Sequence, residues 1–220
     1  MDGMKSVGAR CAWLLLLISA CPALHAAELR VTVIDAGDAP VAGVAVVVDL
    51  DGAFESAVAQ QPGIAVMDQI DEQFVPDLLV IEAGSRVDFP NSDAVLHHVY
   101  SFSEAKQFEL PLFHGRVHSP VIFDNPGLVV VGCNIHDHMV GHILVVESPL
   151  HGVTDEHGTV TFNDLPEANY RVEVFHPEFR LPLTTVASGS TAMAAQRELS
   201  VRVPGRHGPV SNEALAWEDY

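Results

Sequence analysis

Apolar and polar residues alternate along most of the chain with the two-residue period of β-strands. Leu29, Val31 and Val33 share one face of an extended segment, and a valine-rich run follows at residues 41–50. Clusters of Gly, Pro, Asn and Asp separate such segments, and no long segment has the period of a helix. The pattern therefore predicts an all-β fold built as a sandwich. The expected strands lie near residues 28–34, 41–50, 78–81, 86–89, 97–102, 128–131, 143–146, 160–165, 170–175 and 196–203.

Two short apolar segments around Gly84 predict a β-hairpin. Residues 78–81 and 86–89 are strand-like, and a glycine-containing turn separates them. The strand signal is weak over residues 60–73, and residues 103–126 are expected to be rich in loops.

One short loop concentrates the candidate chemistry of the chain. It runs from Gly132 to His142, between the β-branched runs 128–131 and 143–146, so rigid strands are expected to hold it. Sulfur and imidazole together suit copper, with zinc as the main competitor. The candidate ligands in this loop are Cys133, His136, His138, Met139 and His142.

The first residues have the features of a secretory signal. Lys5 and Arg10 precede an apolar core at residues 12–20, and small residues follow near the expected cleavage after Ala26. The apolar core is shorter than the roughly 20 residues that a membrane span needs. We therefore expect residues 1–26 to be removed, and the mature protein to be periplasmic or secreted without a transmembrane segment.

The cysteines support a bound metal. Cys11 and Cys21 lie in the expected leader. Residues 18–21 loosely resemble a lipobox, so a lipid anchor on Cys21 is a minor alternative. Pro22, directly after Cys21, disfavours it. Cys133 would then be the one remaining cysteine in an oxidising compartment, where an exposed free thiol is a liability and a metal-bound thiolate is not. A buried, inert cysteine is the alternative interpretation.

The charge of the chain excludes one class of partner. The 220 residues include 11 Lys and Arg against 29 Asp and Glu, a net charge of −18. Nucleic-acid binding needs a basic surface, which this composition does not provide. An acidic surface can attract a partner with a basic docking patch, although it also serves solubility alone.

A histidine pair upstream completes a candidate copper site. His97 and His98 begin a predicted strand, and neighbouring strand residues point to opposite faces, so at most one of them should join the loop ligands. A blue-copper site takes two histidines and one cysteine near a plane, with a weak axial methionine. Structural zinc sites favour four strong ligands instead.

Residues 78–146 resemble a cupredoxin. The resemblance depends on a strand and glycine turn at 79–84, a strand ending at Asn91, the triplet His97-His98-Val99, and the segment from Gly127 to Gly141. The short Cys-x-x-His-x-x-Met spacing is similar to that of amicyanins, and the whole chain resembles secreted proteins labelled methylamine-utilisation or plastocyanin-like. The resemblance implies a Greek-key β-sandwich that binds one copper ion, cycling between Cu(I) and Cu(II). The implied ligands are His97, Cys133, His136 and Met139.

Two histidines depart from the family pattern. His98 stands where blue-copper proteins usually have Asn, and His138 stands where the narrower group usually has Trp. His98 is expected beside the site or on the surface. His138 and His142 are either surface residues, a second site, or replacements for Met139; a replacement would give a green or red site and a poorer electron carrier. The remaining candidates, expected to be ordinary polar residues or weak accessory copper ligands, are His114, His118, His151, His157 and His176.

The flanking segments resemble a second sandwich. Residues 154–162 and 165–172 look like the second half of a carboxypeptidase-regulatory or transthyretin-like (Ig-like) sandwich, and residues 31–50 look like its first half. We therefore expect a cupredoxin domain at 60–148 inserted into a smaller sandwich formed by 27–59 plus 150–203. The expected flexible tail covers 204–220.

The favoured interpretation is a one-electron carrier rather than an enzyme, with His136 as the electron exit and an unknown redox partner. The surplus of histidines keeps copper storage or delivery open as the alternative. A copper oxidase or reductase would need an open coordination position and a substrate pocket, and the sequence lacks the set of His-x-His motifs of a trinuclear centre. A purely structural sandwich with an incidental Cys133 is the remaining interpretation.

Overall fold

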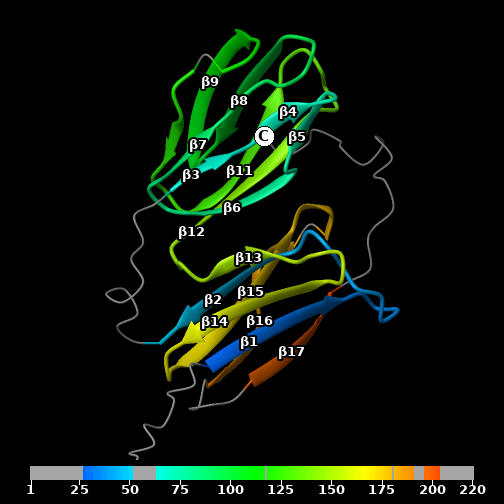
Figure 1. Cartoon of the computed structure of the whole chain (residues 1–220), viewed down its shortest axis with the longest axis vertical. Helices are drawn as coiled ribbons and strands as arrows, with labels where there is room; N and C mark the ends of the chain where they lie inside the picture. The colour runs from blue at the N-terminus through cyan, green and yellow to red at the C-terminus, as the bar shows by residue number, and fades with distance from the viewer. Residues whose placement is uncertain (1–26, 52–62, 117, 180, 191–195, 204–220) are drawn as a thin grey trace, which may run out of the picture.

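The computed structural model describes residues 27–51, 63–116, 118–179, 181–190 and 196–203 (Figure 1). The expected leader at 1–26, with Cys11 and Cys21, and the expected tail at 204–220 lie outside these residues. Strands make up the fold; the one helical element in the described part is the short 3-10 turn η2 at Pro177–Phe179. The prediction of an all-β sandwich fold is therefore confirmed. Within the same ranges, no helix has the length and apolar character needed to span a bilayer.

The first sandwich is built from both ends of the described chain and fills the lower half of Figure 1. Its sheets have the strand orders β14-β1-β17 and β13-β2-β15-β16. Leu29, Val31 and Val33 are fully buried, as their alternation predicts, in a core shared with the valines of β2. Its strands are β1 (Ala27–Ile34), β2 (Ala45–Leu50), β13 (His151–Val153), β14 (Thr159–Leu165), β15 (Asn169–His176), β16 (Leu181–Ser190) and β17 (Gln196–Arg202).

The second sandwich is continuous in sequence and lies in the upper half of Figure 1. Within the described residues its sheets have the orders β6-β12-β11-β8-β9 and β10-β7-β3, with β4 and β5 as a separate hairpin. Phe123, Val129, Val131 and Ile143 are fully buried in its core. Its strands are β3 (Ile64–Val66), β4 (Asp68–Ile70), β5 (Gln73–Val75), β6 (Leu78–Glu82), β7 (Ser85–Asp88), β8 (His97–Ser103), β9 (Lys106–Phe113), β10 (Val121–Phe123), β11 (Gly127–Cys133) and β12 (Val140–Val146).

The prediction of a hairpin around Gly84 is wrong. β6 pairs in parallel with β12, whereas β7 pairs with β10 and β3, so the turn carries the chain from one sheet to the other. The N–H of Ala83 donates to the carbonyl of Val146 and that of Gly84 to the carbonyl of Phe123, both at 2.8 Å. A glycine turn between two apolar segments shows where the chain bends, but the partners of both strands are distant in sequence and leave no local signal.

Several strands lie where the sequence pattern is weak. β3, β4 and β5 fall in or near the segment 60–73, and β9 and β10 occupy the region expected to be rich in loops. β9 contains Pro111, which has no N–H to donate and argues against a central strand. The structure accommodates it because β9 is at the edge of its sheet, with β8 as its partner there.

The valine run of β2 does not alternate because both of its faces are covered. Val46 and Val48 belong to the core of the first sandwich. The opposite face joins a small apolar cluster that connects the two sandwiches. Its members are Ala45, Val47, Leu78, Leu144, Val146 and Phe175. Burial on both sides explains why this strand reads as a continuous apolar run.

We propose that residues 60–148 fold as an independent domain, because the core of the second sandwich is made wholly of residues from this range. The fragment expressed alone is expected to unfold cooperatively in urea, monitored by circular dichroism. Its excision exposes Leu78, Leu144 and Val146, so a matched fragment carrying Leu144→Thr guards against aggregation. If both fragments stay unfolded even with copper, the chain does not contain a separate inserted domain.

Gly158 is expected to be intolerant of any side chain. It has φ +69°, and a Cβ there would lie 2.5 Å from the carbonyl oxygen of Val33 and 2.9 Å from the backbone nitrogen of Val41. Gly158→Ala should lower the free energy of unfolding by about 2 kcal/mol or more, because left-handed backbone strain adds to the clash. Urea denaturation measures the loss. Gly63→Ala is the control, because nothing lies within 4 Å of a Cβ there; equal effects of the two changes would contradict the prediction.

Candidate metal centre

Two strand ends and one loop position the candidate site. His97 begins β8, Cys133 ends β11, and His136 lies on the loop from β11 to β12. β8 and β11 are antiparallel neighbours, with Cys133 opposite Val99. This pairing places residues far apart in the sequence at the same end of one sheet.

The structure brings one sulfur and two ring nitrogens into a small triangle. The Sγ of Cys133 lies 3.5 Å from Nδ1 of His136 and 3.7 Å from Nδ1 of His97, and the two nitrogens are 3.1 Å apart. The circle through these atoms has a radius of about 2.0 Å, close to metal–nitrogen bonds of about 2.0–2.1 Å and slightly below metal–thiolate bonds of about 2.3 Å. The three residues therefore have the geometry to hold one metal ion.

The site is shielded on one side and accessible on the other. His97 is 0% exposed and Cys133 is 4% exposed, whereas His136 is half-buried. Cys133 is a free thiol in this structure. A bound ion would meet protein on the side of His97 and Cys133, and it would approach solvent through the imidazole of His136.

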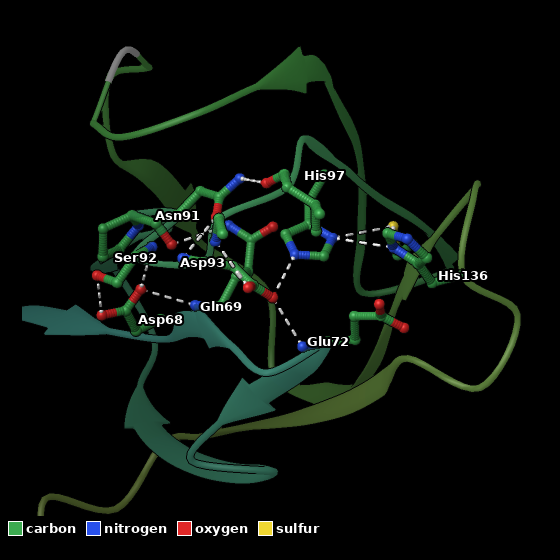
Figure 2. A network of polar contacts seen from close by, with 12 residues as sticks. Asp68, Gln69, Glu72, Asn91, Ser92, Asp93, His97 and His136 are labelled. Atoms are coloured by element: carbon green, nitrogen blue, oxygen red, sulfur yellow. Dashed lines mark hydrogen bonds and ion pairs between the residues drawn. The ribbon is translucent and has the colours of Figure 1, made fainter.

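Asp93 sets the orientation of His97. Its Oδ2 lies 3.1 Å from Nε2 of His97, and Figure 2 shows the carboxylate between this ring and the backbone nitrogen of Glu72. An Nε2–H that donates to Asp93 leaves the lone pair of Nδ1 directed at the triangle. The N–H of Glu72 and then the His97 ring hold the pKa of Asp93 below its ordinary value, so this carboxyl stays ionised.

A buried amide fixes the loop that carries Asp93. Asn91 donates through Nδ2 to the carbonyls of Val95 and Phe113, both at 2.8 Å, and its Oδ1 accepts the N–H of Asp93 at 3.0 Å. These bonds, part of the network in Figure 2, hold the carboxylate in place before β8 begins.

Met139 is buried and closes the ligand loop. Its N–H donates to the carbonyl of His136 at 2.9 Å, and its own carbonyl accepts the N–H of Cys133 at 3.2 Å. The side chain is 1% exposed and packs in the same apolar cluster as Cys133. The backbone of Met139 therefore links the loop to both His136 and Cys133.

The other nearby histidines do not join the triangle. His98 points to the opposite face of β8, with its Nε2 2.8 Å from Glu109. His138 is exposed and lies 3.3 Å from a carboxylate oxygen of Glu72. His142 alternates on β12 with the buried Ile143 and so faces away from that core; burial lowers its pKa. Five further histidines also lie outside the cluster found among the described residues: His114, His118, His151, His157 and His176.

Sequence reasoning missed Asp93 and Glu72. Asp93 lies in a turn four residues before His97, where no strand or helix period predicts which way a side chain points. Glu72 lies in a segment with a weak pattern, and its role depends on a backbone N–H that any residue except proline carries. The one available signal was an acidic residue in the turn that precedes a candidate ligand.

No protein-family model matches the chain, and no curated protein matches it. Among solved structures, a purple cupredoxin from Nitrosopumilus maritimus is 22% identical with a TM-score of 0.34, over 37% of this chain and 99% of that chain. An amicyanin mutant in its reduced state is 19% identical with a TM-score of 0.34, over 46% of this chain and 99% of that chain. A copper-containing nitrite reductase from Thermus scotoductus SA-01 is 24% identical with a TM-score of 0.36, over 45% of this chain and 25% of that chain. These TM-scores are low, and the assignment of a metal depends on the atoms of the site.

Removal of a triangle residue should abolish tight metal binding. We expect His136→Ala to weaken Co²⁺ binding by at least about 100-fold, more than the loss of an outer partner of a ligand costs. His98→Ala is the matched control, because it removes a neighbouring imidazole from the other face of β8; its effect should stay within about threefold. Competition titrations of the full chain against a chelator measure both. Equal losses would mean that the triangle is not the binding site.

Proposed function

We propose that this chain is a periplasmic or secreted mononuclear copper protein that transfers single electrons. The observation that carries the proposal is the triangle of Cys133 Sγ, His97 Nδ1 and His136 Nδ1, with the thioether of Met139 buried in the same cluster. Two imidazoles, one thiolate and one weak thioether are the ligand set of a blue-copper site. Bound at these residues, copper would supply a one-electron couple between Cu(I) and Cu(II).

The donor set favours copper over zinc. A structural zinc site takes four strong ligands in a tetrahedron, and the triangle offers three. Within the described residues, the other histidines and carboxylates that could supply a fourth strong ligand lie outside the cluster. We assign the remaining position to Met139, because a long, weak axial methionine is typical of copper sites built on two histidines and one cysteine.

The protein's own residues would keep rearrangement small during electron transfer. The side chain of Asp93 fixes the ring of His97. Strand pairing and the backbone hydrogen bond from Cys133 to Met139 fix Cys133. Metal ligands that are already in place need little movement when the charge of the ion changes, and this favours rapid electron transfer. The buried side of the site also excludes water from His97 and Cys133.

His136 is the proposed exit for the electron. Its ring is half-buried, and exposed apolar side chains adjoin the ligands in sequence: Ile135 next to His136 is 48% exposed, and Leu96 next to His97 is 50% exposed. A redox partner could desolvate such a surface on docking. The net charge of −18 favours a partner with a basic docking patch. The first sandwich would serve docking or placement.

We propose no catalytic role. A groove of about 500 Å³ lies at the junction of the two sandwiches, where its lining includes Leu128, Leu144 and Phe175. None of the four proposed copper ligands lines this groove. A substrate bound in this groove would not meet the metal, so the groove gives no reason to propose an oxidase or reductase.

Visible and EPR spectra of the copper-loaded, oxidised protein test the proposal. We expect one copper ion per chain and an intense thiolate-to-copper band, which Cys133→Ser should remove because the oxygen ligand lacks this transition. A colourless copper-loaded protein would contradict electron transfer through such a site. More than one tightly held ion per chain would instead favour copper storage or delivery.

A further inference from the structure

We infer that Asp93 is a positioning residue that biases the site toward divalent ions, and that the turn between β4 and β5 holds it in place. The inference deepens the proposed copper function and depends on the same triangle of donor atoms. It concerns the partner of His97, which is not itself a ligand. The contacts of Asp93, the shape of the turn and the burial of the pair support it.

Three hydrogen bonds immobilise the carboxylate. Oδ2 accepts from the N–H of Glu72 at 2.8 Å and lies 3.1 Å from Nε2 of His97, while Oδ1 accepts from the N–H of Ala94 at 2.7 Å. The side chain of Asp93 is 13% exposed, and that of His97 is 0% exposed. The pair is therefore largely removed from water, and solvent screens it weakly.

The turn that supplies the N–H of Glu72 has an unusual backbone. Asp71 and Glu72 have φ values of +51° and +55°, a left-handed conformation that is costly for residues other than glycine. Two contacts of Glu72 accompany this conformation. The N–H of Glu72 donates to the carboxylate of Asp93. The side chain of Glu72 pairs with His138 on the ligand loop. A single turn thus reaches both segments that carry ligands.

Hydrogen bonds of Gln69 anchor the β4–β5 hairpin to the segment that precedes β8. Gln69 in β4 is fully buried and donates through Nε2 to the carbonyl of Pro90 at 2.9 Å. The N–H of Ser92 in turn donates to the carbonyl of Gln69 at 3.1 Å. Figure 2 shows Gln69 and Ser92 on one side of Asp93 and His97 on the other. The position of the carboxylate is therefore set by the fold before any ion binds.

A fixed negative charge behind a ligand acts differently on different ions. The carboxylate makes the His97 imidazole a better donor, and its attraction for the ion grows with the charge of the ion. A divalent ion gains more than a monovalent ion at the same place. Asp93 should therefore strengthen binding of Cu²⁺, Zn²⁺ and Co²⁺ more than binding of Cu⁺, and so lower the reduction potential of the copper couple.

The test is Asp93→Asn in the full chain, with Co²⁺, Zn²⁺ and Cu⁺ affinities measured by chelator competition. We expect the divalent ions to bind about 10- to 100-fold more weakly, as loss of a ligand's outer partner usually causes, and Cu⁺ to lose clearly less. The reduction potential of the copper form should rise accordingly.

Asp68→Asn is the matched control. Asp68 belongs to the same network, where it accepts from Ser92 Oγ at 2.8 Å and from the N–H of Gln69 at 2.7 Å, but it does not contact His97. Asp68→Asn also removes one negative charge near the site, but not one that contacts a ligand. Its effect on all three affinities should therefore stay within about threefold. Equal losses in the two variants, or equal losses for Cu⁺ and the divalent ions in Asp93→Asn, would overturn the inference.

A measurement on the wild-type protein covers the case in which Asp93→Asn does not fold. In the Co²⁺ form, the Nε2–H of His97 should give a shifted proton NMR signal that exchanges slowly with water, because it is buried and bonded to a carboxylate. A fast-exchanging proton would overturn the inference. These Co²⁺ and Zn²⁺ results stand apart from the visible spectrum of the copper form, so the failure of the proposed function and the failure of this inference are distinguishable.

Discussion

The antiparallel pairing of β8 with β11 is the interaction on which the candidate site depends. It places Cys133 opposite Val99 and so brings His97 to the same end of the sheet. Because strand residues alternate between faces, a slip of one position would turn His97 outward and His98 inward. Burial of Val99 and Ser101 on the core side makes that slip costly. The register that completes the core is therefore the register that brings the candidate metal ligands together.

The sequence allowed prediction of strands with a local alternation and, through the resemblance, of the three residues that the structure brings together. Alternation at Leu29, Val31 and Val33 predicts a half-buried strand, and the same rule separates His97 from His98. Strand partners are set by distant residues, which is why β6 and β7 look like a hairpin and are not one. Asp93 illustrates the limit for the site, because its direction follows from a turn, a buried amide and a backbone N–H that no periodic pattern encodes.

The attachment of the first sandwich leaves the metal end of the second one free. Leu144 and Val146, which belong to the cluster between the sandwiches, lie in the second half of β12, whereas the ligand loop precedes its start. A strand of this length spans about 20 Å. The apolar contact between the sandwiches can therefore be extensive without covering His136. Figure 1 shows β6 and β12 next to the lower sandwich, with β8 and β9 farther from it.

The two histidines of the triangle have opposite surroundings, and the difference fits the proposed electron transfer, in which the ion keeps the same ligands. His97 is fully buried and bonded to an ionised carboxylate, so its ring has one orientation and one tautomer. His136 is half-buried, and its Nδ1 contacts Cys133 and His97. Under the proposed function, a rigid, charged partner on one side would hold the ion in the protein. A histidine that reaches the surface on the other side would let a docked partner approach within a short distance of the ion while Cys133 stays covered.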